Sequence, residues 1–477
     1  MKSLKSFLAV LSCTAILLPI NSSAQGTEIS ITTGSEEARK AFIIGRQFKE
    51  NIQIEDAEMQ FNRAIELDPQ FALAYLYRGH PGDYEKALSL IDKVSEGERL
   101  AIKYLKAYDF YELKVAKEYL AQLLEQYPSS KHVHLWAGLF YENIMHNYQL
   151  ALDHFHIASR LDNTYAAPYN EMGYRQMRLG NVEKAEDAFL MYIELAPECP
   201  NSFDSYANFL MKLKRYDESI KQYSDAYDLN PDKSITIARI GQNYAFRGQY
   251  SEARSYYDRF YELSDKIGQK ATALSLSAAS YLAEGNIKEA EMMMDKYIAL
   301  GKKMNRNTEI VLGTANLGFI NLEMGDSEKG LKMYLSAASM LDKLALPEPT
   351  KNRYSFSSLG WLARAYAVNG DFRKADNYLS QARKIADKSN NPMFRNDYNL
   401  FMGYVEIERG NYKEAINNLL LCSQDNPFNI YILARAYSLA GESESALELV
   451  EILNSWEDFG LDYIVARTKS QKLNTED

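Results

Sequence analysis

The strongest constraint on this chain is a unit of about 34 residues that recurs along it. Its clearest copy, residues 166–197, reads AAPYNEMGYRQMRLGNVEKAEDAFLMYIELAP. Steps of 34 residues from Ala185 reach Ala151, Ser219 and Ala253, and an aromatic residue follows each of these small residues four positions later. Such a period is typical of folds in which one supersecondary unit is stacked many times. The sequence therefore predicts an array of repeats.

Each unit is predicted to be a helical hairpin. Two segments of the unit place apolar residues at the 3.6-residue spacing of amphipathic helices. Between them, Gly180 can take the left-handed conformation that ends a helix, Asn181 can cap the next helix, and Pro197 prevents further continuation. The small residues Gly173 and Ala185 allow the two backbones to approach closely where the helices cross. A hairpin of this kind buries its apolar face only by stacking on its neighbours.

The fixed positions of Gly, Ala, aromatic and Pro residues resemble the tetratricopeptide repeat, a helix-turn-helix family. Two copies carry the resemblance best, with Tyr169, Met172, Gly173, Ala185, Phe189 and Pro197 in one and Ile44, Gly45, Phe48, Ala57, Phe61, Ala64 and Pro69 in the other. The resemblance implies an all-α fold, a right-handed superhelical α-solenoid of about 12 hairpins. It also implies a non-enzymatic interaction scaffold that binds a protein or peptide in a concave groove.

The repeats are interrupted at a few places. The copies between Ala72 and Pro128 are irregular, since one is short and the next lacks the glycine. The remaining boundaries follow from composition: a polar, loose lead-in at 25–37, repeats at 38–343, a proline-containing link and bend at 344–355, repeats at 356–455, and a cap of the last hairpin with a frayed tail at 456–477.

The N-terminus has the order of a secretory signal peptide. Lys2 and Lys5 precede an apolar run from Phe7 to Ile20, and small polar residues follow up to Ala24. Residues 1–24 are therefore predicted to be removed on export to the periplasm or the cell exterior. An alternative is a lipid on Cys13, which would make the protein a membrane-tethered lipoprotein of an assembly or nutrient-capture complex.

The composition narrows the classes of partner. A formal charge of −10 and a pI near 5.4 argue against nucleic acid and favour a cationic protein surface. No nucleotide-binding, metalloprotease, nucleophile-elbow or dithiol motif occurs, so no enzyme activity, cofactor or metal is expected. An enzyme with a site assembled from distant residues stays an alternative. The two cysteines after residue 24, Cys199 and Cys422, lie too far apart in a repeat array for a disulfide and are predicted to be core residues.

The groove implied by the resemblance should carry side chains that hydrogen-bond to an extended peptide. The exposed stripe of successive first helices predicts Asn170, Tyr174, Arg178, Asp204, Asn208, Lys212 and Gln242 at this surface. The two-carboxylate clamp of some family members is not evident here, so a C-terminal peptide ligand is not supported.

Two residue classes invite a functional interpretation that their spacing does not favour. Five of the six histidines, His132, His134, His146, His154 and His156, fall in one repeat, but i, i+2 spacing on a helix points side chains apart, so a metal site is not predicted. Most of the 35 tyrosines are predicted to pack in the core, among them Tyr223, Tyr244, Tyr257, Tyr281, Tyr334, Tyr366 and Tyr437.

Overall fold

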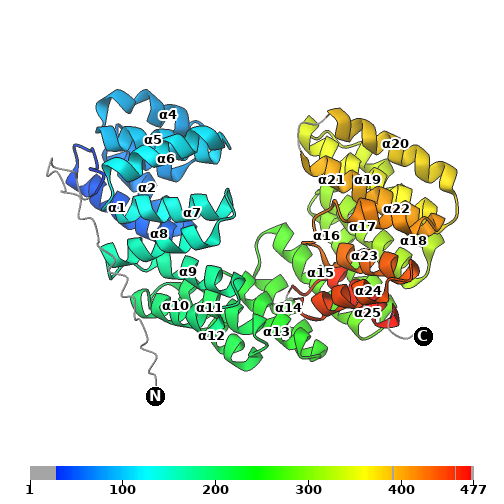
Figure 1. Cartoon of the computed structure of the whole chain (residues 1–477). Coiled ribbons are helices and arrows are strands. Elements are labelled where there is room, and N and C mark those ends of the chain that lie inside the picture. Colours follow the sequence, from blue (N-terminus) through cyan, green and yellow to red (C-terminus); the bar gives the residue numbers. More distant parts are fainter. Residues whose placement is uncertain (1–27, 389–391, 457, 474–477) are drawn as a thin grey trace, which may run out of the picture. The chain divides into compact units, whose positions relative to one another are not determined.

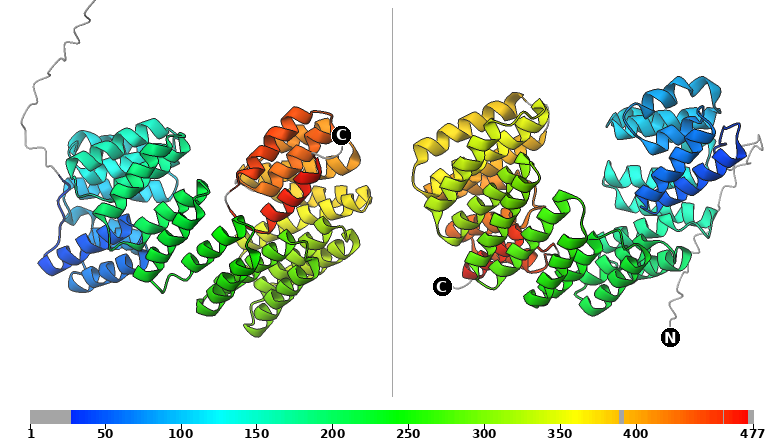
Figure 2. Two further views of the ribbon diagram at one scale, coloured as in Figure 1. Left: turned by 90° about the horizontal axis from the view of Figure 1, so that it is seen from below. Right: turned by 180° about the vertical axis from the view of Figure 1, so that it is seen from behind.

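The computed structural model describes residues 28–388, 392–456 and 458–473, and these residues contain helices and no strand (Figures 1 and 2). The signal peptide, its cleavage site and Cys13 lie outside the described residues. The chain forms two compact units, which divide between Ala196 and Pro197. We call them unit 1 and unit 2 and describe each by itself.

Unit 1 contains ten α-helices and one short 3₁₀-helix in its described part. They are α1 (Glu36–Glu50), α2 (Ile54–Leu67), α3 (Ala72–Arg78), α4 (Asp83–Ser89), η1 (Ile91–Lys93), α5 (Glu96–Asp109), α6 (Leu113–Gln126), α7 (Lys131–Asn143), α8 (Tyr148–Leu161), α9 (Ala167–Arg178) and α10 (Val182–Leu195).

Unit 2 contains fifteen α-helices in its described part. They are α11 (Pro200–Lys212), α12 (Tyr216–Leu229), α13 (Ile235–Phe246), α14 (Tyr250–Leu263), α15 (Ile267–Ala283), α16 (Ile287–Lys303), α17 (Asn307–Met324), α18 (Ser327–Asp342), α19 (Glu348–Val368), α20 (Phe372–Lys388), α21 (Pro392–Arg409), α22 (Tyr412–Leu419), α23 (Pro427–Leu439), α24 (Ser443–Asn454) and α25 (Leu461–Leu473).

Consecutive helices pair into hairpins, from α1 with α2 to α23 with α24. The described residues thus contain twelve hairpins followed by one further helix, which confirms the expected all-α solenoid. The right-handed superhelix stays a prediction. The second hairpin is short, as its sequence predicts, because α3 and α4 have seven residues each. The wider spacing after Ala253 comes from longer helices, which reach 21 residues in α19.

The helix crossings explain why the unit needs a glycine. A Cβ atom added to Gly173 would lie 2.6 Å from ring atoms of Phe189, and one added to Gly241 would lie 2.6 Å from the ring of Tyr257. The same relation joins Gly45 to the ring of Phe61. The absence of a side chain on the first helix is therefore what lets the aromatic ring of the second helix fill the crossing.

The turns inside the hairpins share a left-handed residue, which is a glycine in only part of them. Gly180 has φ 76°, and the same place in other hairpins is taken by Ile52 (φ 61°), Tyr111 (φ 59°), His146 (φ 50°) and Lys214 (φ 60°). The irregular copy around Pro128 therefore lacks the glycine because Tyr111 takes its conformation. The sequence predicted these hairpins from their other positions, without a glycine in the turn.

The lead-in before α1 is not loose over its described residues. The Ser130 hydroxyl donates to Glu28 Oε2 at 2.6 Å, and the Thr32 N–H donates to the buried Glu98 Oε1 at 2.7 Å. Ile29 and Ile31 pack against the core of unit 1. The prediction of a loose segment was wrong here because alternating isoleucines and acceptor side chains fix the lead-in against α5 and α7.

The predicted link at 344–355 is also wrong in extent. Only residues 343–347 connect α18 to α19, and Pro349 lies in the first turn of α19. A proline is tolerated at this position because the first N–H groups of a helix have no intrahelical partner. Helices α18 and α19 pack on each other, so no break between subdomains occurs at this point.

Most of the tyrosines and cysteines that the sequence predicted for the core are buried or half-buried. Tyr223, Tyr257, Tyr334 and Tyr366 are buried, and the other three tyrosines named above are half-buried. Cys199 is buried, whereas Cys422 is half-buried and its Sγ lies 3.2 Å from the backbone oxygen of Asn396.

Candidate partner-binding groove

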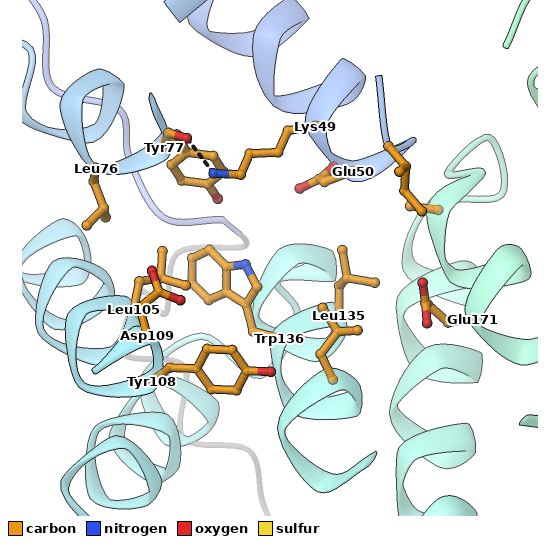
Figure 3. A pocket seen from close by; sticks show the side chains of 13 residues that line it. Lys49, Glu50, Leu76, Tyr77, Leu105, Tyr108, Asp109, Leu135, Trp136 and Glu171 are labelled. Atoms are coloured by element: carbon orange, nitrogen blue, oxygen red, sulfur yellow. Dashed lines mark hydrogen bonds between the residues drawn. The ribbon is translucent and has the colours of Figure 1, made fainter. Parts of the chain in front are cut away.

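A pocket of about 300 Å³ opens on the face of unit 1 that the first helices of its hairpins form (Figure 3). Its lining comes from α1, α3, α5, α7, α9 and the turn after α1, and from no second helix of a hairpin. The lining residues are Lys49, Glu50, Ile52, Leu76, Tyr77, Leu105, Tyr108, Asp109, Leu135, Trp136, Leu139, Ala167 and Glu171.

The apolar part of this pocket is built on Trp136. The indole packs against Tyr104, whose hydroxyl donates to the Trp136 backbone oxygen at 3.2 Å. Figure 3 shows Trp136 between Tyr77 and Tyr108, with Leu135 on the same helix beside it. Large aromatic side chains held rigidly around a concave apolar surface are typical of sites that anchor a partner side chain.

The polar part of the pocket has more acids than bases. Three carboxylates, Glu50, Asp109 and Glu171, line it together with one ammonium group, that of Lys49. Lys49 Nζ donates to the backbone oxygen of Tyr77 (Figure 3). Burial lowers the pKa of Lys49, although Asp109 opposes this effect.

Glu50 is held as a carboxylate by its neighbours. Burial alone would raise its pKa, but His132 and Arg46 bring the pKa below its ordinary value. His132 Nδ1 lies 3.0 Å from Glu50 Oε1, while Glu50 Oε2 is buried without a hydrogen-bond partner. The Tyr77 hydroxyl in the same pocket is also buried without one. Unpaired buried polar atoms are rare, because each loses its hydration.

A second acidic group on α7 and α9 includes the pocket residue Glu171. Arg175 forms ion pairs with Glu142 and, at 3.2 Å, with Glu171. Burial raises the pKa of Glu142 to about 7 despite Arg175, and burial also raises the pKa of Glu171. Glu142 Oε2 and Asn170 Oδ1 are buried without a hydrogen-bond partner.

Backbone strain marks the edge of the pocket. Ile52 lines it with φ 61°, and its side chain is 47% exposed. A β-branched residue is a true outlier in this conformation, which costs about 1 to 3 kcal/mol. The same left-handed residue occurs in the other hairpin turns, so the strain at Ile52 belongs to the turn, and what Ile52 adds to the pocket is its exposed apolar side chain.

In unit 2 the corresponding face is covered by the chain itself. Helix α25 packs on α15, α17 and α23, which are first helices of their hairpins, as well as on its neighbour α24 (Figures 1 and 2). Phe459, just before α25, contacts the Phe246 ring of α13 at 5.7 Å between centroids. The segment predicted to cap only the last hairpin therefore also contacts the earlier helices α15 and α17. The predicted frayed tail is helical as far as Leu473.

A buried ion-pair cluster fixes α25 to this face. Glu323 of α17 pairs with Arg364 of α19 and, at 2.8 Å, with Lys469 of α25. Burial would raise the pKa of Glu323, but these two cations bring it below its ordinary value. A pocket of about 470 Å³ remains beside the Phe459 loop, and there Arg239 and Gln242 already contact Asp458.

The predicted groove residues divide between the two units and do not all face the groove. On α9 the pocket is lined by Ala167 and Glu171. The predicted stripe of Asn170, Tyr174 and Arg178 is displaced by one residue, which is a rotation of about 100° on a helix. Asn170 is buried, the Tyr174 ring packs edge-on against Phe189, and Arg178 donates to the Tyr148 hydroxyl at 3.1 Å.

In unit 2, Asp204, Asn208 and Lys212 are half-buried on α11. Burial raises the pKa of Asp204, and nearby cations oppose this effect. Gln242 lies on the face that α25 covers, and it donates to the Phe459 backbone oxygen at 3.3 Å. The sequence had placed Gln242 on the groove face, but its partner here belongs to the same chain.

The apolar pocket residues were missed by sequence reasoning. Leu135, Trp136 and Leu139 recur at i, i+1 and i+4 on α7, and they form one stripe of a helix. This apolar stripe is the sequence signal that indicates the pocket on α7.

The histidines of this region are held by local contacts. His134 Nε2 lies 3.0 Å from the Pro128 carbonyl oxygen and must donate to it, so His134 Nδ1 accepts from His154 Nδ1 at 2.9 Å. Burial and the neighbouring His134 lower the pKa of His154 to about 4. Both rings are therefore neutral near pH 7. Across the described residues, no group of three or more His, Cys, Asp or Glu is arranged to hold a metal ion.

One family model matches a part of the chain. Residues 170–234 match the tetratricopeptide repeat family. The chain is 24% identical over 308 residues to a CTR9 homolog of Arabidopsis thaliana. This alignment covers 62% of the chain and 26% of that protein. It is 25% identical over 190 residues to anaphase-promoting complex subunit 3 of Schizosaccharomyces pombe. That alignment covers 39% of the chain and 28% of the relative. The chain thus spans about a quarter of the length of these curated relatives.

Solved structures with similar helical arrangements include the apo form of RapI, with a TM-score of 0.41, 12% identity and coverage of 80% of this chain and 99% of that one. A tetratricopeptide repeat protein from Parabacteroides merdae has a TM-score of 0.37 and 13% identity, and the match covers 58% and 98%. Among the described helices, none combines the length and the apolar character needed to cross a membrane.

Proposed function

We propose that the chain is a non-enzymatic scaffold that binds a segment of a partner protein in the pocket of unit 1, because its helical hairpins recur along the described residues and residues 170–234 match the tetratricopeptide repeat family. The observation that carries the proposal is the contrast between the two first-helix faces. In unit 2, α25 covers α15, α17 and α23, and in the pocket left beside it Arg239 and Gln242 already contact Asp458. The face of unit 1 presents Trp136 and unpaired polar atoms around an open pocket.

Several features support binding over catalysis. The carboxylates around the pocket are engaged by His132, Arg175 and the Tyr84 hydroxyl, and no serine, threonine or cysteine lines it. At about 300 Å³ the pocket is at the small end of ligand sites, so it fits one or two side chains of a peptide.

A peptide-display selection tests this proposal. We expect the purified protein to select peptides whose affinity falls roughly 30-fold or more in Trp136→Ala, as for the central anchor of an interface. Since Trp136 also contributes to packing, Leu139→Arg provides a second variant that fills the pocket from a half-buried position. Isothermal titration calorimetry gives the affinities.

The matched control is Leu190→Arg, which makes the same change at an exposed leucine of α10 that does not line the pocket. We expect this variant to bind the selected peptides with unchanged affinity. If the selected peptides bound all three variants equally well, the pocket would not be the binding site and the proposal would be wrong.

We propose further that the protein is exported after removal of residues 1–24. The support is the sequence order of Lys2, Lys5, the apolar run and the small residues before Gln25. The intact mass of the protein from its native cell decides between the two forms of the proposal. A mature N-terminus at Gln25 supports export of the free protein, a diacylated Cys13 supports the tethered alternative, and retention of Met1 to Ala24 excludes both.

A further inference from the structure

We propose that the pocket of unit 1 recognises a basic side chain, arginine or lysine, next to a bulky apolar one on the partner segment. This inference rests on the proposed function and names the chemistry of its partner. The apolar neighbour would pack on Trp136, and the basic group would lie among the carboxylates of the pocket.

The first support is the kind of hydrogen-bonding atom left without a partner. Glu50 lines the pocket from α1, and its Oε2 is buried without a hydrogen-bond partner. The pKa of this carboxyl lies below its ordinary value and its side chain is 8% exposed, so Oε2 is an acceptor held in a largely dry place. What this atom lacks is a donor, and the groups with the most donors in a polypeptide are guanidinium and ammonium.

The second support is the charge around the pocket. The side chains that line the pocket include three carboxyl groups, those of Glu50, Asp109 and Glu171, and one ammonium group, that of Lys49. Arg175 is shared between Glu171 and Glu142, and Lys49 is bound to the Tyr77 backbone oxygen. An incoming cation would therefore meet a lining in which acids outnumber bases.

The third support is the position of the aromatic rings. Tyr77, Tyr108 and Trp136 line the same space as Glu50 and Asp109 (Figure 3). A cation near aromatic faces is attracted by their quadrupoles, and guanidinium groups are the commonest example in proteins. An acidic partner segment would instead place its carboxylate against three lining carboxylates, which like-charge repulsion disfavours.

Three capped peptides of identical length test the inference by calorimetry. Their core is Leu-X-Trp between Gly-Ser spacers, where X is arginine, citrulline or glutamate. Citrulline keeps the shape of arginine and loses its charge. We expect the arginine peptide to bind on the order of ten-fold more tightly than the citrulline peptide, because hydrogen bonds to a charged group are stronger, and the glutamate peptide to bind weakest.

Two variants locate the charge effect. Glu50→Gln and the exposed Asp109→Asn should each reduce the ratio of arginine to citrulline affinity several-fold, whereas Glu118→Gln on α6 should leave the ratio unchanged. Equal binding of the arginine and citrulline peptides, a preference for glutamate, or no binding of any of the three overturns the inference.

The outcomes separate this inference from the proposed function. If the arginine and citrulline peptides bind equally and both lose affinity in Trp136→Ala, the pocket is the binding site but has no preference for a basic side chain. If peptides from the display selection bind with the same affinity when Trp136 or Leu139 is replaced, the pocket is not the binding site.

Discussion

Removal of residues 456–477 is expected to prevent stable folding of unit 2 while leaving unit 1 folded. The truncation uncovers the first-helix face by deleting Phe459, Tyr463, Ile464 and Val465, each of which is 4% exposed or less. Burial of each such side chain contributes about 1.5 to 3 kcal/mol, so the sum is comparable with the roughly 5 to 15 kcal/mol that holds a typical domain folded. Thermal unfolding followed by circular dichroism should show one transition lost and one retained.

A synthetic peptide of residues 456–473 provides the control for this truncation. We expect it to restore the lost transition when added in excess, because a ligand that binds only the folded state stabilises it by mass action. A scrambled peptide of the same composition should not. A truncated protein that melts at the temperature of the full chain would show that α25 contributes nothing to this face.

Replacement of Arg364 by alanine is expected to destabilise unit 2 by about 3 to 5 kcal/mol. Arg364 is 3% exposed and forms an ion pair with Glu323, whose side chain is fully buried. Removing one partner leaves a buried carboxylate with only Lys469 to balance it, and an uncompensated buried charge is strongly destabilising. Urea unfolding measures the loss as a change in midpoint.

The double variant Glu323→Leu with Arg364→Met distinguishes charge from packing. We expect it to recover most of the lost stability, because apolar groups of similar volume can replace a buried ion pair with little penalty, and Lys469 can extend to solvent. Arg383→Ala is the surface comparison, since Arg383 and Asp387 are both exposed, and it should cost less than about 1 kcal/mol. An Arg364→Ala protein as stable as this surface variant would contradict the prediction.

The hairpins could be predicted because their rules are local. Gly173, Ala185 and Phe189 have fixed spacing in the sequence and meet at one crossing, so a single copy reveals the packing of many. The exceptions are also local but are not encoded by residue type. Tyr111 and Ile52 take a left-handed conformation that glycine normally takes, and their residue types do not predict this conformation.

The site could be predicted only in outline, because it depends on contacts between distant residues. The rotation of α9 that brings Glu171 and not Tyr174 to the pocket is set by packing against α10, where Tyr174 meets Phe189. The return of α25 onto α15 and α17 joins segments that lie far apart in the sequence, as in the pairing of Lys469 with Glu323, which is 146 residues away. No periodicity in the sequence reports such a contact.

Hydrogen–deuterium exchange with and without a display-selected peptide tests the central claim most directly. If the open face of unit 1 binds the partner and that of unit 2 is covered by α25, the peptide should slow exchange in α3, α5, α7 and the last turn of α1. Exchange in α13, α15, α17 and α23 should stay the same. Protection confined to these helices of unit 2, or to the second helices α2, α6 and α8, would contradict the account.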